Sequence, residues 1–178
     1  ADSSRRIVVV SALGKRNKSD HKITDLLFLT GAHLKYGVDA KSVFNIVKER
    51  YFEVKKDLNV SIDLEKEFEI IESKFSSNID EEYLVSRGEY LAAKLMASYL
   101  GFTFVDAEDL IFFDYDGNIN EEKTIEALKE ILKEKNNIVV PGFYGAYPDG
   151  KIHLLSRGGS DVTGSILAIA SSATIYEN

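Results

Sequence analysis

The segment whose residue types could most clearly do chemistry is 155–161, which reads Leu-Ser-Arg-Gly-Gly-Ser-Asp. It follows a strand-like apolar run at 152–155 and precedes a helix-like run of small residues at 162–173. A strand, a tight glycine turn and a helix start form anion-binding sites in α/β proteins. Arg157 can hold a carboxylate or phosphate through two parallel hydrogen bonds, and Asp161 places a negative charge nearby. The turn therefore suits a ligand that carries both charges, such as an amino acid, although the two residues could also pair with each other.

The remaining residues of this turn add backbone and hydroxyl donors. Gly158 and Gly159 let the backbone approach a ligand closely because neither carries a side chain. Ser160 and Asp161 suit the N-cap region of the helix that follows. A capped turn without any ligand is the alternative that the spacing alone leaves open.

Two hydroxyl groups flank the first predicted loop. Ser11 lies near the end of a valine-rich apolar run over 6–12, which predicts a strand covered on both faces. Thr24 lies at the start of a helical stripe that Gly37 can end. Both hydroxyls could act only as local caps. Because ligands of open α/β sheets collect at the carboxyl ends of strands, the pattern also fits a binding site.

A glutamate lies within the helix predicted over 80–100. On a helix, a glutamate usually belongs to a solvated face, and this is the ordinary interpretation of Glu89. The same helix carries Leu84, Leu91 and Leu95, so one of its faces packs in the core. A carboxylate near that face needs a partner.

Glycines recur in the segment 142–150, which also carries Phe143. Gly142 and Gly145 could be turn glycines only. The Gly-Lys-Arg at 14–16 invites comparison with a P-loop, but it lacks the first glycine of that motif and the hydroxyl residue after lysine. We therefore predict a solvated basic loop there.

Short apolar runs alternate with helical patterns along the chain. Strands are predicted at 6–12, 102–106, 111–113, 138–141 and 152–155, with a hairpin turn at 147–150 before the last of them. Helices are predicted from 23 to Gly37, at 40–57, 63–75 and 80–100, after an Asn120 cap, and at 162–173. This alternation predicts a three-layer α/β/α domain with a mostly parallel sheet. The strand-free segment 38–77 predicts a helical insertion over one end of the sheet.

The composition is that of a globular domain with an acidic surface. The chain has 178 residues, 44% of them hydrophobic, and a net charge of -7. These values suit one domain and argue against nucleic acid or an anionic membrane as a partner. No apolar run approaches the roughly 20 residues of a transmembrane helix. Zero cysteines rule out disulfides and fit a reducing cytoplasm, and three scattered histidines give no metal-ligand spacing.

Four segments, in order, resemble the catalytic domain of aspartate kinases in the amino-acid kinase superfamily. The first is Val-Val-Val-Ser-Ala at 8–12 with Ile-Thr-Asp-Leu-Leu at 23–27. The others are Ser-Arg-Gly-Glu at 86–89 with Leu-Ala-Ala-Lys-Leu at 91–95, Val-Val-Pro-Gly-Phe-Tyr-Gly at 139–145, and Arg-Gly-Gly-Ser-Asp at 157–161. The four segments appear in the order of the family, and the resemblance spans 6–178, nearly the whole chain.

The resemblance implies the amino-acid kinase fold and a role for each candidate residue. Arg157 would bind the substrate α-carboxylate, with Gly158, Gly159 and Ser160 as further donors. Asp161, the predicted catalytic residue, would lie near the substrate ammonium or the reacting centre. The other expected substrate contacts are Glu89 facing the ammonium, Thr24 against the substrate, Ser11 near the side-chain carboxylate, and Phe143 closing over the ligand.

The implied activity is transfer of the γ-phosphoryl of Mg-ATP to the β-carboxylate of L-aspartate, the first step of the aspartate-derived amino-acid pathway. The family holds ATP through a lysine-glycine strand that would precede Arg6 and a segment that would follow Asn178. We therefore expect residues 1–178 to be a partial catalytic domain, cut at both ends, that is inactive alone. A homo-oligomer in the cytoplasm is expected for the full-length protein. The alternatives are a glutamate or acetylglutamate kinase, or a non-catalytic amino-acid-binding fragment.

Overall fold

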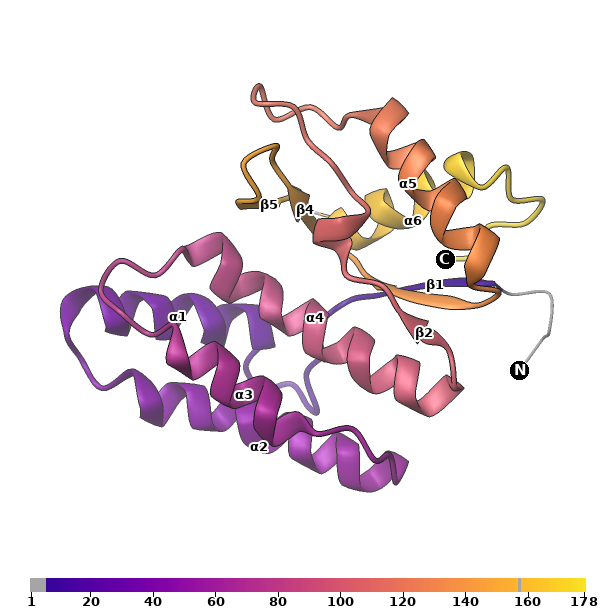
Figure 1. Ribbon diagram of the computed structural model, residues 1–178. Coiled ribbons are helices and arrows are strands. Elements are labelled where there is room, and N and C mark those ends of the chain that lie inside the picture. Colours follow the sequence, from indigo (N-terminus) through magenta and orange to yellow (C-terminus); the bar gives the residue numbers. More distant parts are fainter. Residues whose placement is uncertain (1–5, 157) are drawn as a thin grey trace.

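The computed structural model describes residues 6–156 and 158–178 and contains both helices and strands (Figure 1). The strands are β1 Ile7–Val10, β2 Thr103–Phe104, β3 Ile138–Pro141, β4 Tyr144–Ala146 and β5 Ile152–Leu154. The α-helices are α1 Ile23–Tyr36, α2 Ala40–Leu58, α3 Leu64–Ser73, α4 Glu81–Leu100, α5 Glu121–Glu134 and α6 Gly159–Ala170, with a short 3₁₀ helix, η1, at Ala107–Asp109.

The main sheet has the strand order β1-β3-β2, and both strand pairs are parallel. Parallel strands need long connections, and the chain supplies them with α1–α4 between β1 and β2 and with α5 between β2 and β3. Alternate residues of β1 and β3 face opposite sides. Val8, Val10 and Val139 pack against α4, whereas Ile7, Val9, Ile138 and Val140 pack with residues of α5 and α6. The predicted three-layer α/β/α architecture with a mostly parallel sheet is confirmed.

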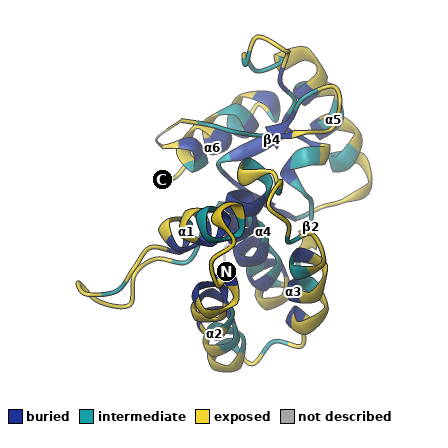
Figure 2. Ribbon diagram, turned by 90° about the vertical axis from the view of Figure 1, so that its left-hand side faces the viewer, coloured by how far each residue is buried: buried dark blue, intermediate teal, exposed yellow. Residues whose placement is uncertain are grey.

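The segment 38–77 forms the strand-free insertion expected from the sequence. Its two helices, α2 and α3, pack on α1 and α4 around an aromatic cluster. In this cluster the ring centroids of Phe44 and Phe68 are 5.7 Å apart. The insertion therefore rests on helices rather than directly on the sheet. Figure 2 shows that α4, which lies between the insertion and the sheet, is buried along much of its length.

Helix ends follow local capping chemistry. Asp80 accepts hydrogen bonds from Glu82 N and Tyr83 N at the start of α4, and Gly101 ends that helix in the left-handed region. Asn120 caps α5 in the same way, and Gly37 ends α1. These four predicted boundaries are confirmed. No helix in the described part of the chain is long and apolar enough to cross a membrane.

Several boundaries differ from the expectation. The segment predicted as a strand at 111–113 makes only isolated bridges, Phe112 to Ala146 and Phe113 to Ile119. Helix α6 begins at Gly159, three residues earlier than predicted, and its N-cap is Gly158 rather than Ser160 or Asp161. Gly158 has a φ of 75°, which glycine adopts without strain, so the glycine turn itself opens the helix.

Candidate active site

The carboxyl ends of β1 and β3 meet at one edge of the sheet. Gly142 N donates a hydrogen bond of 2.9 Å to Val10 O, which continues the ladder one residue past β3. Ser11, the next residue after β1, is exposed at this edge. Ser11, which the resemblance places near the reacting carboxylate, therefore lies beside the glycine segment that follows β3.

The N-terminus of α6 packs on the same edge. A Cβ atom added to Gly142 would lie 2.7 Å from Ser160 Cα, so only glycine allows this approach. Gly142 is thus a close-contact glycine, not merely a turn residue. Gly158 caps α6 without a side-chain hydrogen bond, and the first-turn amides of a helix have no partner within it. These amides and the helix dipole can receive an anion.

Phe143 is held in an unusual conformation between these two elements. Its φ is 79°, in the left-handed region that non-glycine residues rarely adopt. Its N–H donates to Thr163 Oγ1 at 3.2 Å, and its carbonyl accepts from Leu155 N at 2.7 Å. Its ring lies against Gly159, where an added Cβ would be 2.8 Å from Phe143 Cδ2. Such strain clusters at ligand sites, which fits the predicted role of this ring over a substrate.

Glu89 reaches this edge from α4. It is only 4% exposed, so the ordinary interpretation of a solvated helical glutamate is wrong. Its Oε1 accepts a hydrogen bond from Ala12 N at 3.3 Å, next to Ser11. Its Oε2 is buried and has no hydrogen-bond partner among the described residues.

Burial dominates the electrostatics of this carboxylate. Desolvation raises the pKa of Glu89 to about 7, although backbone hydrogen bonds, including that from Ala12, and the charge of Arg87 act in the opposite direction. A buried carboxylate oxygen without a donor is costly unless a ligand supplies one. A ligand ammonium is a donor of the right charge.

Thr24 comes close to the site through helix packing. Gly88, the neighbour of Glu89, would place an added Cβ 3.1 Å from both Ala12 Cβ and Ile23 Cγ2. The start of α1 therefore lies against α4 where the loop leaves β1. Thr24 is half-buried in the first turn of α1, whose N-cap is Lys22, so the simple capping role is not observed for Thr24.

The Arg-Gly-Gly-Ser-Asp turn is described except for Arg157, which lies outside the described residues. Asp161 is exposed in the first turn of α6. Its backbone carbonyl accepts hydrogen bonds from Ser165 Oγ at 2.9 Å and from Tyr176 Oη at 3.2 Å. The structure thus brings Ser11, Glu89, Phe143 and the start of α6 to one edge of the sheet, with the first turn of α1, which carries Thr24, packed beside Gly88.

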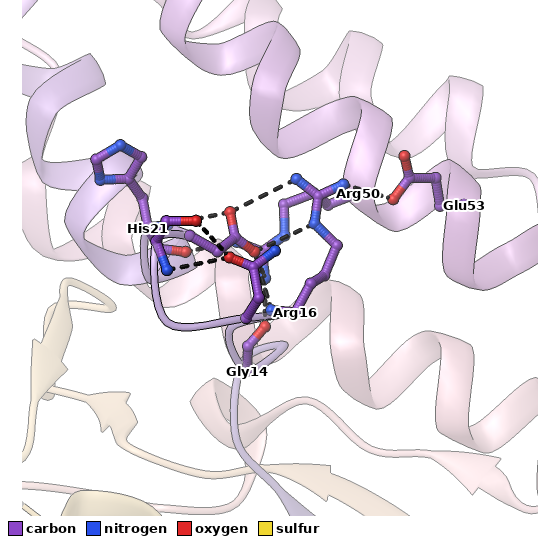
Figure 3. A network of polar contacts seen from close by, with 8 residues as sticks. Gly14, Arg16, His21, Arg50 and Glu53 are labelled. Carbon is purple, nitrogen blue, oxygen red and sulfur yellow. Dashed lines mark hydrogen bonds and ion pairs between the residues drawn. The ribbon is translucent and has the colours of Figure 1, made fainter.

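Residues that the sequence did not single out support the loop over 11–22. Arg50 of α2 is 2% exposed and donates to the carbonyls of Gly14 and His21. Arg16 pairs with Asp20 at 3.1 Å and with Glu53 at 2.9 Å, as Figure 3 shows for this network. The signal that could have revealed Arg50 is its place on an otherwise apolar stripe of α2.

The basic residues of this loop were predicted to be solvated. Lys15, Arg16 and Lys18 are exposed, as expected for a solvated loop. Hydrogen bonds from the Arg16 backbone and side chain, with a contribution from the Arg50 charge, hold the pKa of Asp20 well below its ordinary value. The loop is therefore a charged surface segment held together by hydrogen bonds and ion pairs.

A separate cavity of about 550 Å³ lies on another side of α4. It is lined by Tyr83, Arg87 and Tyr90 of that helix and by Asp106, among others, and includes none of the predicted site residues. Arg87 is 5% exposed and its guanidinium stacks 4.3 Å from the Tyr90 ring centroid. We place the candidate site at the strand ends because the unpartnered Oε2 of Glu89 lies there together with the N-terminus of α6, whose first amides have no partner within the helix.

Comparison with known proteins agrees with this geometry. Aspartokinase 3 of Bacillus subtilis (strain 168) is 33% identical over 194 residues, covering 100% of this chain and 42% of that protein. The crystal structure of Clostridium acetobutylicum aspartate kinase matches with a TM-score of 0.95 and 42% identity, over 99% of this chain and 41% of that one. E. coli aspartokinase III, in complex with aspartate and ADP, shares the fold, with a TM-score of 0.75 and 21% identity over 95% of this chain and 41% of that one.

The chain thus spans about two fifths of the length of these relatives, 42% and 41% in the first two cases. The model of the amino acid kinase family matches residues 1–178, the whole of the chain. By sequence and by fold, this chain belongs to the amino acid kinase family.

Proposed function

We propose that this chain supplies the amino-acid half of an aspartate kinase site, which phosphorylates the β-carboxylate of L-aspartate at the expense of ATP. The observation that carries the proposal is Glu89, a buried carboxylate with one unpartnered oxygen at the edge where α6 begins. The edge thus offers a negative group for an ammonium and helix amides for an anion. The names of the two relatives with 33% and 42% identity support aspartate as the amino acid.

The chemistry needs alignment more than proton transfer. The β-carboxyl of aspartate is already ionised at neutral pH because its ordinary pKa is about 3.9. One of its oxygens attacks the γ-phosphorus of ATP, the bond from that phosphorus to the bridging oxygen breaks, and ADP leaves with the electron pair. No general base is required, so orientation of the two substrates and neutralisation of charge supply the catalysis.

Each candidate residue has a proposed role in that alignment. Glu89 holds the ammonium of aspartate, and Arg157 holds its α-carboxylate. The side-chain carboxylate then lies near Ser11 and the amides of Gly158, Gly159 and Ser160. Asp161 lies nearest the reacting centre, and Thr24 and Phe143 enclose the ligand. Two charged anchors at one end of a short substrate leave its other carboxylate as the nucleophile.

ATP binding completes the proposal. We assign the groups that hold the β- and γ-phosphates to polypeptide outside residues 1–178, in keeping with the share of the relatives that the chain covers. Mg²⁺ usually binds through phosphates, waters and one or two carboxylates. We therefore assign Mg²⁺ to the phosphates of the nucleotide and no step to the described residues. A cytoplasmic homo-oligomer is part of the same proposal.

The test uses the full-length protein with ATP and Mg²⁺, with the acyl phosphate trapped as its hydroxamate. L-aspartate, L-glutamate and N-acetyl-L-glutamate are compared as acceptors. Turnover with aspartate alone is the expected result. Turnover with either of the other two acceptors but not aspartate would assign a different amino-acid kinase, and aspartate binding without any hydroxamate would assign a non-catalytic binding protein.

A further inference from the structure

The loop over 11–22, between β1 and α1, begins and ends at the candidate site. Ser11 and Ala12 are its first residues, and Thr24 lies in α1 just past its end. In a long, charged loop the distance between these residues would vary unless a contact joined the two ends of the loop. Arg50 joins them, because one guanidinium donates to Gly14 O near the start of the loop and to His21 O near its end, the latter at 2.7 Å (Figure 3).

The charge of Arg50 is balanced inside the same loop. Its Nη2 lies 3.5 Å from Asp20 Oδ2, and the two side chains are 3% and 8% exposed. Asp20 also accepts from Arg16 N at 2.9 Å and from His21 N at 3.0 Å. The buried arginine and the aspartate thus hold the loop against α2. The two carbonyls are bound by two different nitrogens of a planar guanidinium, and a lysine, which has one nitrogen, could not keep both bonds in this geometry.

The next residue of α2 acts on the third part of the site. Tyr51 is fully buried, and its hydroxyl donates to Gly88 O at 2.6 Å. Gly88 precedes Glu89 and packs directly on Ala12 and Ile23. The bond therefore fixes α4 at the turn that presents Glu89 to Ala12 N.

The helix that carries these two residues is itself well anchored. The Tyr51 ring packs against Phe68 with centroids 6.2 Å apart, and Phe44 and Val47 of α2 are fully buried. A packed helix is a rigid support, whereas a loop held only by surface charges is not.

We propose that Arg50 and Tyr51 are positioning residues through which the helical insertion holds the aspartate site in its binding geometry. Arg50 sets the spacing between Ser11 and Thr24, and Tyr51 sets the position of Glu89. In the described part of the chain, the hydrogen bonds of the two side chains go to the loop and to α4. The inference rests on the proposed function, since it concerns how aspartate is held.

The test compares Arg50→Lys and Tyr51→Phe with Lys48→Met in the full-length protein. Lys48 is a matched control because it lies on the same helix and pairs with Glu72 of α3 at 3.1 Å, away from the loop. We expect both test variants to raise the KM for aspartate about tenfold or more, since small misplacements of reacting groups are costly, and to change the KM for ATP less than about twofold. Lys48→Met should leave both constants unchanged.

A second readout does not depend on activity. The loop carries exposed trypsin sites at Lys15, Arg16, Lys18 and Lys22. Arg50→Lys should be cut there faster than the wild type, while Tyr51→Phe, which leaves the loop bonds intact, should not. Tyr51→Phe removes one hydroxyl from a packed ring, so it tests the idea even if the arginine variant fails to fold.

A failure of the proposed function and a failure of the positioning role give different results. A wild-type protein that does not phosphorylate aspartate would defeat the proposed function. If the wild type is active and both variants lose thermal stability with the KM for aspartate unchanged, then Arg50 and Tyr51 are structural only and the positioning role is wrong. An equal rise in the KM values for aspartate and ATP would overturn it as well.

Discussion

Raising the pH from 6 to 8 should strengthen aspartate binding through the charge of Glu89. With a pKa of about 7, the carboxyl is about nine-tenths protonated at pH 6 and about nine-tenths ionised at pH 8. The ammonium of aspartate stays protonated over this range and needs the ionised carboxylate. The affinity should therefore rise about tenfold, and binding at pH 6 should release about 0.9 proton per aspartate.

The same burial predicts the pH dependence of stability without ligand. The pKa of Glu89 is raised from 4.5 to about 7, so the folded state binds more protons than the unfolded state between these values. The contribution of this group to stability is therefore lost as pH rises through that window. The shift amounts to about 3 kcal/mol at 1.36 kcal/mol per unit. Glu89→Gln should remove this term, so its free energy of unfolding should fall less than that of the wild type from pH 5 to pH 8.

Calorimetric titration with aspartate at pH 6, 7 and 8, in two buffers of different ionisation enthalpy, measures both the affinity and the protons released. Glu89→Gln should bind weakly with a flat pH profile, because the ammonium loses its counter-charge. Glu126→Gln, an exposed glutamate of α5, should keep the wild-type profile. Equal wild-type affinity at pH 6 and pH 8 with no proton release would show that Glu89 does not face the ammonium.

Three further predictions concern the rest of the site. Arg157→Lys should weaken aspartate binding about tenfold or more while the KM for ATP stays near its wild-type value, because lysine cannot make the two-pronged contact; an altered ATP KM alone would refute the carboxylate role. Gly142→Ala should destabilise the protein by about 1–3 kcal/mol and impair activity, since the new methyl group would lie 2.7 Å from Ser160 Cα; urea unfolding that matches the wild type would contradict that contact. A purified polypeptide of residues 1–178 should bind ATP weakly or not at all and form no aspartyl phosphate, and hydroxamate formed at an ordinary enzymatic rate would show that these residues suffice.

Much of the fold could be predicted from local chemistry. Apolar runs marked β1 and β3, and residues such as Asp80, Gly101 and Asn120 marked helix ends, because capping depends on neighbours in sequence. The strand predicted at 111–113 was wrong. Its residue types are typical of strands, but Phe112 and Phe113 form only isolated bridges, to Ala146 and Ile119. Strand formation depends on a partner that the run itself does not specify.

For the candidate site, too, some features could be predicted from the sequence and others depended on packing. The resemblance to aspartate kinases predicted Ser11, Thr24, Glu89 and Phe143 as substrate contacts, whereas the residue types alone also allowed caps and solvated positions. The sequence could not decide whether Glu89 is solvated, because helical periodicity assigns a face but not what covers it. Packing of α1 and Ala12 against Gly88 buries the carboxylate and raises its pKa.

The sequence by itself determined the α/β class, most helix ends and the family of the chain, since these depend on residue types and short spacings. Only the tertiary structure showed that Arg50 joins Gly14 to His21 and that Tyr51 bonds to Gly88. These contacts join residues 29 to 37 positions apart in the chain. Hydrogen bonds between residues so far apart in the chain form only when the hydrophobic core brings the helices together, so no local sequence pattern predicts them.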